Sequence, residues 1–565
     1  MTSTKVAVAD YLMSRLNELG THHIAGVVGD FSLHLFQHIE KSKVKLIPTC
    51  NELNAGYFAD AYSRVTGKLG ALAVTYSVGE MSAINAIGGS FSENVPVVLI
   101  GGCPATIDYQ NVTPLHHVVN NDYDIPWKAL SLVTIASVVL KDVTKAAENI
   151  DFCLTAAIYN KLPVYIGIPS DVVSMKIDAP KTKLVVPQRP KSCKEELKLA
   201  VHDTLLALQE SKNPVILLDH EIDKFHLHKE VKELVQNSGL PFITNIMGKG
   251  IITETHKMYG GTYSGNRSQP QVQKLVEDAD FLLILGLKVT DFNSGGWSEK
   301  FPKDKSIFAN MDTLSMTKHT FLNINLREFI QELADKVKFV LHDEPEKPLL
   351  TLSKPTSRKI SMQYLFDRVS QWIPDNSTVI AETGSALFAG AEMQLSKNST
   401  FLAQVMYGSI GFTVGGCLGS AIAGSKMHKR AVCFVGDGSF QVTCQDLSTM
   451  IRYKCNPVIF LLNNGNYLVE NLIGNGREFN DIQPWKYSEL VNVFGGSTKT
   501  AWGVRVEKET ELELALKKAK KNHRKLAFIE VILPKCDAPR SMIAASASMA
   551  KVNHVTKPPK ICKRS

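Results

Sequence analysis

Residues 430–439 read RAVCFVGDGS and residues 458–466 read VIFLLNNGN, and these two stretches decide the fold. Each begins with an apolar run that is typical of a buried strand. The first run ends at Asp437, which lies between two glycines that let the backbone turn sharply, and residues 440–452 then have a helical pattern. We expect a strand, helix and strand whose parallel pairing brings Asp437 and Asn464 to one edge of a sheet.

This edge has the composition of a site for a diphosphate that is held through a divalent cation. Aspartate, an asparagine amide and a backbone carbonyl are oxygen ligands that suit Mg²⁺, which also binds phosphate and water. The helix that follows Asp437 would add its N-terminal N–H groups and its dipole. Taken alone, Gly-Asp-Gly is just as typical of a surface turn. The whole pattern predicts an enzyme with a diphosphate cofactor.

The composition is that of a multidomain globular protein. The 565 residues suggest about three to four domains. Hydrophobic residues make up 44% and charged residues 21% of the chain, and no apolar segment is long enough to cross a membrane, so a membrane protein is not indicated. The net charge of +8 comes from scattered lysines, which gives nucleic-acid binding little support. The ten cysteines form no CxxC pair, which favours reduced thiols and a cytoplasmic protein.

Two stretches rich in proline and lysine, residues 179–191 and 343–355, divide the chain. Around them, short aliphatic runs alternate with amphipathic helical patterns, which is typical of parallel sheets covered by helices on both faces. The glycines of residues 260–265 lack the spacing of a dinucleotide site. We therefore expect an α/β fold with three doubly wound parallel-sheet domains at residues 1–185, 190–342 (Rossmann-like) and 356–540, followed by a C-terminal helix and basic tail at residues 541–565.

Further blocks carry a resemblance to a known family. The chain resembles, over nearly its whole length, the thiamine diphosphate-dependent 2-oxo acid decarboxylases, which include pyruvate, indolepyruvate and branched-chain 2-keto acid decarboxylases. The resemblance implies a pyrimidine-binding first domain and a diphosphate-binding third domain. Beside the motif around Asp437, the blocks are residues 27–31 (VVGDF), 50–57 (CNELNAGY), 78–85 (VGEMSAIN), 114–117 (PLHH), 381–384 (AETG), 408–412 (GSIGF) and 467–470 (YLVE).

The resemblance also implies which residues bind thiamine diphosphate. Glu52 would hydrogen bond N1′ of the aminopyrimidine and favour the imino tautomer that deprotonates the thiazolium C2, and burial in an apolar pocket would suit its pKa to this work. Ile410 would support the bent cofactor from below. The other expected cofactor contacts are Thr383, Ser385, Gly408, Asp437, Gly438, Ser439, Asn464 and Tyr467, and the expected Mg²⁺ ligands are Asp437, Asn464 and the backbone carbonyl of Asn466.

Four more residues resemble the acid and base groups of the family, namely Asp30, His116, His117 and Glu470. The implied reaction is non-oxidative: once CO₂ has left, an enamine must be protonated before the aldehyde departs, and side chains with shifted pKa values can relay those protons. The expected substrate pocket is apolar and has no cation for a second carboxylate. Pyruvate and longer aliphatic or aromatic 2-oxo acids therefore all remain possible substrates. The expected pocket residues are Phe292, Leu387, Phe388, Val469 and Ile473.

Because Glu52 and Asp437 belong to different domains, the cofactor must lie between two surfaces. In the family these surfaces come from different subunits, which implies a homodimer with active sites at its interface, or a homotetramer of D₂ symmetry. Two alternatives remain open. A carboligase of the acetohydroxyacid synthase type would be expected to lack the His116-His117 pair and Glu470. A catalytically silent regulator with the same fold would be expected to have lost Glu52 or Asp437.

Overall fold

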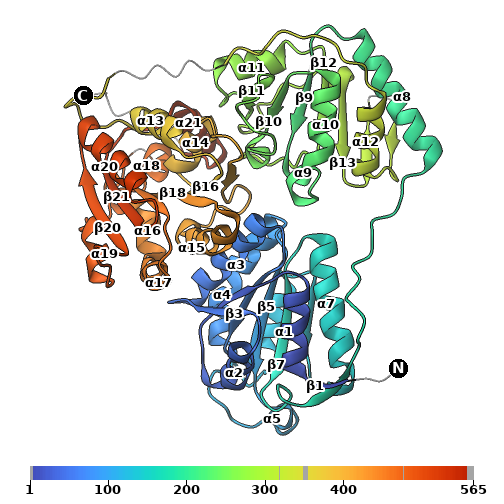
Figure 1. Cartoon of the computed structure of the whole chain (residues 1–565), viewed down its shortest axis with the longest axis vertical. Helices are drawn as coiled ribbons and strands as arrows, with labels where there is room; N and C mark the ends of the chain where they lie inside the picture. The colour runs from blue at the N-terminus through green and yellow to red at the C-terminus, as the bar shows by residue number, and fades with distance from the viewer. Residues whose placement is uncertain (1–3, 317–318, 348–353, 475, 556–565) are drawn as a thin grey trace.

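The computed structural model describes residues 4–316, 319–347, 354–474 and 476–555, which form three α/β units (Figure 1). Each unit has one sheet with helices against it. A two-stranded antiparallel ribbon of β1 (Thr4–Ala7) and β8 (Lys176–Ala179) joins the two ends of the first unit. The three sheets agree with the predicted fold class.

The sheets of the first and third units are wholly parallel and have the same topology. If β2 and β16 are each counted as strand 1 of their unit, both sheets have the strand order 2-1-3-4-6-5. The first sheet consists of β3 (Lys45–Pro48), β2 (His23–Gly26), β4 (Gly70–Val74), β5 (Val97–Cys103), β7 (Val164–Pro169) and β6 (Ala136–Val139). The third consists of β17 (Thr400–Leu402), β16 (Ser377–Ala381), β18 (Arg430–Gly436), β19 (Val458–Asn463), β21 (Leu526–Ile532) and β20 (Ala501–Val506).

The central sheet departs from the prediction of a purely parallel sheet. Its last two strands, β14 and β15, pair antiparallel at one edge. Antiparallel edge strands are common on otherwise parallel sheets because a short hairpin can extend an edge without a crossover helix. The sheet consists of β11 (Tyr259–Thr262), β10 (Phe242–Thr244), β9 (Pro214–Leu218), β12 (Phe281–Leu285), β13 (Ser306–Asn310), β14 (Thr313–Ser315) and β15 (Thr320–Phe321).

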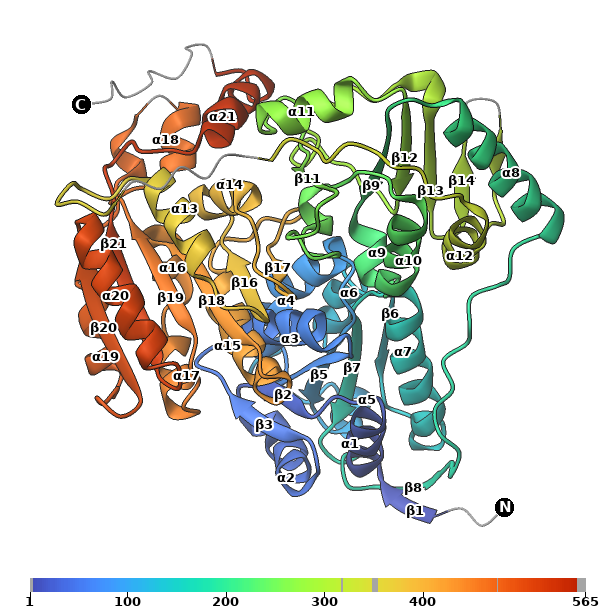
Figure 2. The ribbon, with the colours of Figure 1, turned by 45° about the horizontal axis from the view of Figure 1, so that its top comes forward.

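The helices lie on both faces of the sheets (Figures 1 and 2). The first unit contains α1 (Val8–Glu18), α2 (Leu33–Lys41), α3 (Glu52–Thr66), α4 (Val78–Ser92), α5 (Thr106–Asn111), α6 (Ile125–Ser131) and α7 (Ala146–Asn160). The second contains α8 (Lys194–Glu210), α9 (His220–Lys224), α10 (His228–Ser238), α11 (Pro270–Glu277) and α12 (Leu326–Lys336). The third contains α13 (Met362–Trp372), α14 (Ser385–Glu392), α15 (Phe412–Gly424), α16 (Asp437–Thr443), α17 (Asp446–Arg452), α18 (Leu468–Gly474), α19 (Leu490–Val493), α20 (Glu509–Lys521) and α21 (Arg540–Val552).

Helices α3 and α15, which occupy equivalent places in the first and third units, pack closely against each other. A Cβ on Gly419 would lie 2.3 Å from the carbonyl oxygen of Phe58, and one on Gly415 would lie 2.7 Å from that of Asn54. The two helix backbones approach this closely because glycine has no Cβ. One hydrophobic core, to which Phe58 and Leu418 belong, extends across both units. The two predicted halves of the cofactor site are thus joined through a shared core.

The single helix predicted for residues 440–452 is wrong. Helix α16 begins earlier, at Asp437, and the chain breaks before α17 starts at Asp446. At the break, the carbonyl of Thr443 accepts a hydrogen bond from Asn54 Nδ2 at 3.0 Å, and that of Gln445 accepts one from Cys50 Sγ. The first unit therefore supplies donors at the break, although Gln445 also accepts from the N–H of Ser448 at 3.0 Å.

No helix in the described part of the chain is both long and apolar enough to cross a membrane. Among the described residues, eight cysteines are free thiols as predicted, but Cys536 is disulfide-bonded, so the prediction of reduced thiols is wrong at that position; Cys562 lies outside the described residues. Helix α21 agrees with the expected C-terminal helix, whereas residues 556–565 of the expected basic tail lie outside the described residues.

Candidate active site

The edge of the third sheet brings Asp437 and Asn464 together as predicted. Strand β18 ends at Gly436 and pairs in parallel with β19, so that the residues after both strands meet at the same edge. The Asp437 carboxylate is 2% exposed and accepts hydrogen bonds from the backbone N–H groups of Gly438 (2.9 Å), Asn464 (3.0 Å) and Gly465 (2.6 Å). The β18–α16 turn therefore holds one buried acid in a fixed orientation.

The electrostatics of this edge suit a cation. Burial raises the pKa of Asp437 to about 6, although the three N–H donors oppose that shift. Asn466 is also buried, and its side-chain Oδ1 has no hydrogen-bond partner. Leaving a buried acceptor unpaired costs about 1–3 kcal/mol. The prediction involved only the backbone carbonyl of Asn466, and the structure adds an unsatisfied side-chain oxygen at the same position.

Glycines surround this acid with open space. A Cβ on Gly436 would meet no atom closer than 4.0 Å, and one on Gly465 would meet none within 4 Å. A Cβ on Gly408, where φ is +67°, would approach only Thr383, at 3.5 Å. Gly438 is different, because its Cβ would lie 2.5 Å from the ring of Tyr467. These positions form a cradle in which backbone N–H groups can approach a diphosphate, so the residues present fit that group.

The turn that carries Ile410 is held by a buried acid, Glu382. Its Oε2 accepts hydrogen bonds from the N–H of Gly411 (3.2 Å) and from the N–H and hydroxyl of Thr413 (3.3 and 2.5 Å). Its Oε1 accepts from the N–H of Thr383 at 3.1 Å. Burial raises the pKa of Glu382 to about 7. One carboxyl group thus links two segments that are both predicted to contact the cofactor.

The same turn is also held from the first unit. Ser409 Oγ lies 2.5 Å from the hydroxyl of Tyr57 on α3 and accepts a hydrogen bond from Asn85 Nδ2 on α4 at 2.9 Å. On the other side, Thr443 donates to the carbonyl of Gly411 at 2.8 Å. Ile410 itself is 37% exposed. An apolar side chain on a turn that is fixed in this way can hold a bound ligand in one conformation.

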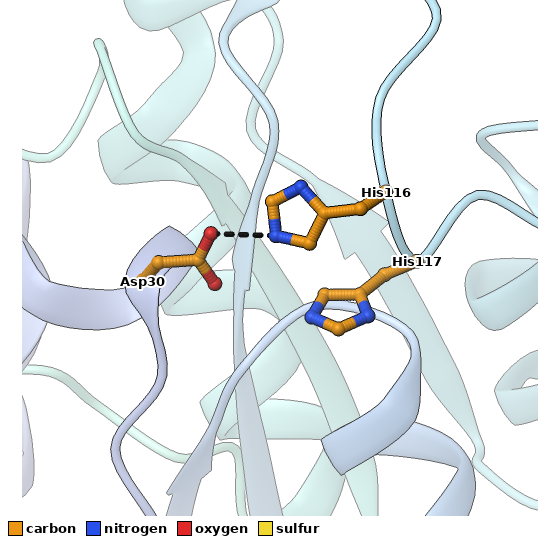
Figure 3. Close-up of side chains that lie close together, drawn as sticks. All are labelled: Asp30, His116 and His117. Carbon is orange, nitrogen blue, oxygen red and sulfur yellow. Dashed lines mark ion pairs between the residues drawn. The ribbon is translucent and has the colours of Figure 1, made fainter.

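Asp30, His116 and His117 form a second group, on the first unit (Figure 3). His116 Nε2 lies 2.7 Å from Asp30 Oδ2, and both side chains are more than half exposed. The two histidine rings lie 4.4 Å apart between centroids, and Phe31 packs against both. His117 has a φ of +66°, which is uncommon for a residue with a side chain. Exposed ion pairs add little stability, so this arrangement points to chemistry rather than to folding.

Glu52 is the first residue of α3, and Asn51 caps this helix by accepting a hydrogen bond from the N–H of Asn54 at 2.8 Å. A Cβ on Gly79 would lie 3.3 Å from Glu52 Oε1, so the start of α4 lies against the carboxylate. Across the described residues, neither Glu52 nor the Asp30 group makes a hydrogen bond or ion pair with the third unit. Glu470 lies in the first turn of α18 and is exposed.

The structure brings most of the predicted pocket residues together. Phe292 and Phe388 lie 5.4 Å apart between ring centroids and share an apolar cluster with Val469. Leu387 is fully buried in an adjoining cluster that also contacts Phe292, whereas Ile473 belongs to neither cluster. Met542 and Ala545 of α21 complete the first cluster. The sequence analysis missed these two residues, although the apolar spacing of this helix could have indicated a packed face.

Comparison with known proteins agrees with this fold. A family model described as "Thiamine pyrophosphate enzyme, N-terminal TPP binding domain" matches residues 6–125. Models for the central domain and the C-terminal TPP binding domain of the same enzymes match residues 201–337 and 382–531. The chain therefore has the three domains of a thiamine pyrophosphate enzyme.

Relatives that align over nearly their full length indicate which family of thiamine pyrophosphate enzymes the chain belongs to. The chain is 36% identical to a pyruvate decarboxylase from Aspergillus terreus, over 97% of this chain and 98% of that protein. It is 34% identical to a pyruvate decarboxylase from Candida albicans and 32% identical to pyruvate decarboxylase isozyme 2 from Saccharomyces cerevisiae, in each case over 97% of this chain and 99% of the relative. The chain belongs to the thiamine diphosphate-dependent 2-oxo acid decarboxylase family.

Proposed function

We propose that this protein converts a 2-oxo acid to an aldehyde and CO₂ without oxidation, using thiamine diphosphate and Mg²⁺. The observation that carries the proposal is the buried Asp437 at a glycine-lined edge, in a chain whose relatives are named pyruvate decarboxylase along their full length. A carboxylate, asparagine oxygens and open backbone N–H groups are what a magnesium diphosphate requires.

The residues of the third unit would bind and orient the cofactor. Asp437, Asn464 and Asn466 would hold Mg²⁺. The diphosphate would lie against Gly438, Ser439 and the neighbouring glycines. Ile410, fixed by Glu382 and by Tyr57, would support the two rings from below. When bound, thiamine diphosphate supplies an electron sink for the carbon atom that loses CO₂. The protein contributes position and electrostatics.

The residues of the first unit would hold and move protons. Glu52 would hold a proton against the aminopyrimidine, from a position at the start of α3 that Asn51 and Gly79 define. Asp30 would orient His116 through their 2.7 Å contact, so that the imidazole faces the substrate side as an acid or base. Glu470 and His117 would complete this set of acids and bases.

The substrate we propose is a monocarboxylic 2-oxo acid with an apolar tail. Phe292, Phe388 and Val469 form an apolar wall, which excludes a second carboxylate because a charge buried without a partner is unfavourable. Pyruvate and longer aliphatic or aromatic tails both fit this description, because one methylene group changes discrimination by only about 1–3 kcal/mol.

We also propose that the active unit is a homodimer, or a tetramer made of such dimers. In the described part of the chain, Glu52 and Asp437 themselves share no hydrogen bond, although their helices contact each other through Asn54 and Thr443. A second copy would place a first unit over the third unit of its partner, as C₂ symmetry allows. Analytical ultracentrifugation tests this point, since a fully active monomer would refute it.

The deciding experiment is an assay of aldehyde release from a panel of 2-oxo acids in the presence of thiamine diphosphate and Mg²⁺. The panel would contain pyruvate, a branched-chain, an aromatic and a dicarboxylic 2-oxo acid. We expect aldehyde from monocarboxylic substrates and none from the dicarboxylic one. No aldehyde from any substrate, with the cofactor demonstrably bound, would contradict the proposed function.

A further inference from the structure

A cavity of about 1110 Å³ lies between the central and third units. Its walls come from β11 and the loop after it, from α13 and α14, and from the chain leading into α21; Figure 2 shows α21 beside α11 and β11. Phe292 and Phe388 line it, so it lies against the wall of the proposed substrate pocket. None of the predicted cofactor, metal or proton-transfer residues lines it. The cavity therefore adjoins the proposed substrate pocket but does not include the proposed cofactor and proton-transfer residues.

Ion pairs neutralise some of the charges around this cavity, whereas Asp367, Asp537 and the exposed Lys347 have no ion pair among the described residues. Lys249 pairs with Glu254 at 2.9 Å, and Lys535 pairs with Asp481 at 2.7 Å. Asp537 accepts a hydrogen bond from the N–H of Met362 at 2.6 Å. Glu392 faces Arg540, whose charge lowers the pKa of Glu392, while burial raises that pKa overall. The remaining acid of the lining, Asp367, accepts a hydrogen bond from Gln363.

Arg267 differs from the other cations of the lining. It is 5% exposed, yet it makes no ion pair with any described residue. One terminal nitrogen donates to the carbonyl of Phe292 at 2.8 Å, whereas its buried Nε has no partner. Asp291 attracts the guanidinium from beyond ion-pair distance. Arginine stays charged in proteins, and a buried charge without a counter-ion is costly. Arg267 is therefore a buried cation without a close counter-ion.

We propose that this cavity binds a small organic monocarboxylate whose carboxylate group meets Arg267. The rest of the wall favours an apolar body for this ligand, because Ile246, Met362, Phe366 and Ala544 line the cavity beside the two phenylalanines. A single unpaired arginine matches a monoanion better than a phosphate ester. Residues 556–565 carry four cationic and no acidic side chains, which makes that segment a poor occupant for a site that needs an anion.

Calorimetric titration of the protein loaded with thiamine diphosphate and Mg²⁺ tests this proposal. The probe is 3-phenylpropanoate, which has no 2-oxo group and cannot react, and the neutral control probe is 3-phenylpropan-1-ol. Arg267→Met removes the charge, and Ala544→Leu fills the cavity from the opposite wall while keeping the arginine. Arg452→Met, on the exposed face of α17, is the matched control for loss of a cation.

We expect the wild type and Arg452→Met to bind the acid and not the alcohol. Arg267→Met and Ala544→Leu should each weaken this binding on the order of 10- to 100-fold, the loss that follows removal of a hydrogen bond to a charged group. Equal binding by all four proteins would place the probe elsewhere, such as the active site, and overturn the proposal, as would no binding by the wild type. If Arg267→Met fails to fold, Ala544→Leu decides. No turnover is measured, so this outcome is independent of the proposed decarboxylation.

Discussion

The first and third units have the same strand order, but the functional side chains at their edges differ in burial and in hydrogen bonding. The first presents Asp30, His116 and Glu52, of which Asp30 and His116 are largely exposed and none is bonded to the third unit. The third presents a buried acid, Asp437, fixed by three backbone N–H groups and surrounded by glycines. One scaffold therefore serves two tasks, because function resides in the loops after the strands and not in the sheet.

The two units also differ in what their buried acids do. Glu80 in the first unit and Glu382 in the third are both buried, and burial raises the pKa of each to about 7. Glu80 accepts hydrogen bonds from the N–H of Ser77 and the hydroxyl of Tyr165, and so fixes the start of α4. Glu382 fixes the turn beneath the proposed cofactor site. This comparison predicts which substitutions should impair binding and which should impair only folding.

The largest expected effect is that of Asp437→Asn. Loss of the carboxylate removes the proposed metal ligand, so thiamine diphosphate affinity should fall more than about 100-fold and aldehyde release should fall to background. Fluorescence titration of the cofactor-free protein measures the affinity. Asp219→Asn, a buried aspartate after β9 in the central unit, is the matched control and should retain the cofactor. Normal cofactor binding by Asp437→Asn would refute its assignment.

Glu52→Gln should separate chemistry from binding. Because an amide cannot exchange the proton that a carboxyl group can, the rate of aldehyde release should fall by about 10²- to 10⁴-fold, the range for general acid–base catalysis. Cofactor affinity should change far less than in Asp437→Asn, since Glu52 lies on the other unit. Steady-state kinetics beside the same fluorescence titration give both quantities. An unchanged rate would remove Glu52 from the mechanism.

Gly419→Ala tests the contact between the two units. Its new Cβ would lie 2.3 Å from the carbonyl oxygen of Phe58, so α3 and α15 must separate, at a cost of about 1–3 kcal/mol in the free energy of unfolding. Gly416→Ala on the same helix is the control, because its Cβ would make only ordinary contacts, at 3.4 Å, with Phe412. Denaturant unfolding should separate the two variants. Equal stabilities would mean that the helices are not closely packed.

Glu382→Gln should have a smaller effect, on binding. The amide cannot accept hydrogen bonds as a carboxylate does from Gly411 and Thr413, so the Ile410 turn loosens and thiamine diphosphate affinity should fall about tenfold. Glu80→Gln, which alters the first unit, should leave this affinity nearly unchanged. A titration in which the two variants lose affinity equally would contradict the positioning role of Glu382.

The pH dependence of stability gives the smallest expected effect. The pKa of Glu382 is about 7 in the folded protein and about 4.5 in the unfolded chain, so the folded state binds the proton more tightly. This group therefore lowers stability as the pH rises from about 4.5 to about 7. The difference in Tm between wild type and Glu382→Gln should be largest near pH 5 and narrow by pH 8. A difference that widens with pH would show that the carboxyl group is ionised throughout.

Local pattern alone predicted much of the secondary structure. Strands β9 (Pro214–Leu218) and β12 (Phe281–Leu285) are examples of the short aliphatic runs that were predicted to form strands, because such runs between turn residues leave few alternatives. The meeting of Asp437 and Asn464 was also predictable, since parallel strands place their ends at one edge. The role of Glu382 was missed even though its motif was noted. An acid directly after a buried strand could have indicated it.

The sequence by itself determined the α/β class, the family and the residues of the candidate site, because these depend on short-range spacing and on recognisable motifs. Only the tertiary structure decided the break between α16 and α17, the fixing of Ser409 by Tyr57 and Asn85, and the cavity beside Arg267. Each of these depends on contacts between residues far apart in the chain. Side-chain periodicity carries no information about such partners, since they are selected by how whole units pack against each other.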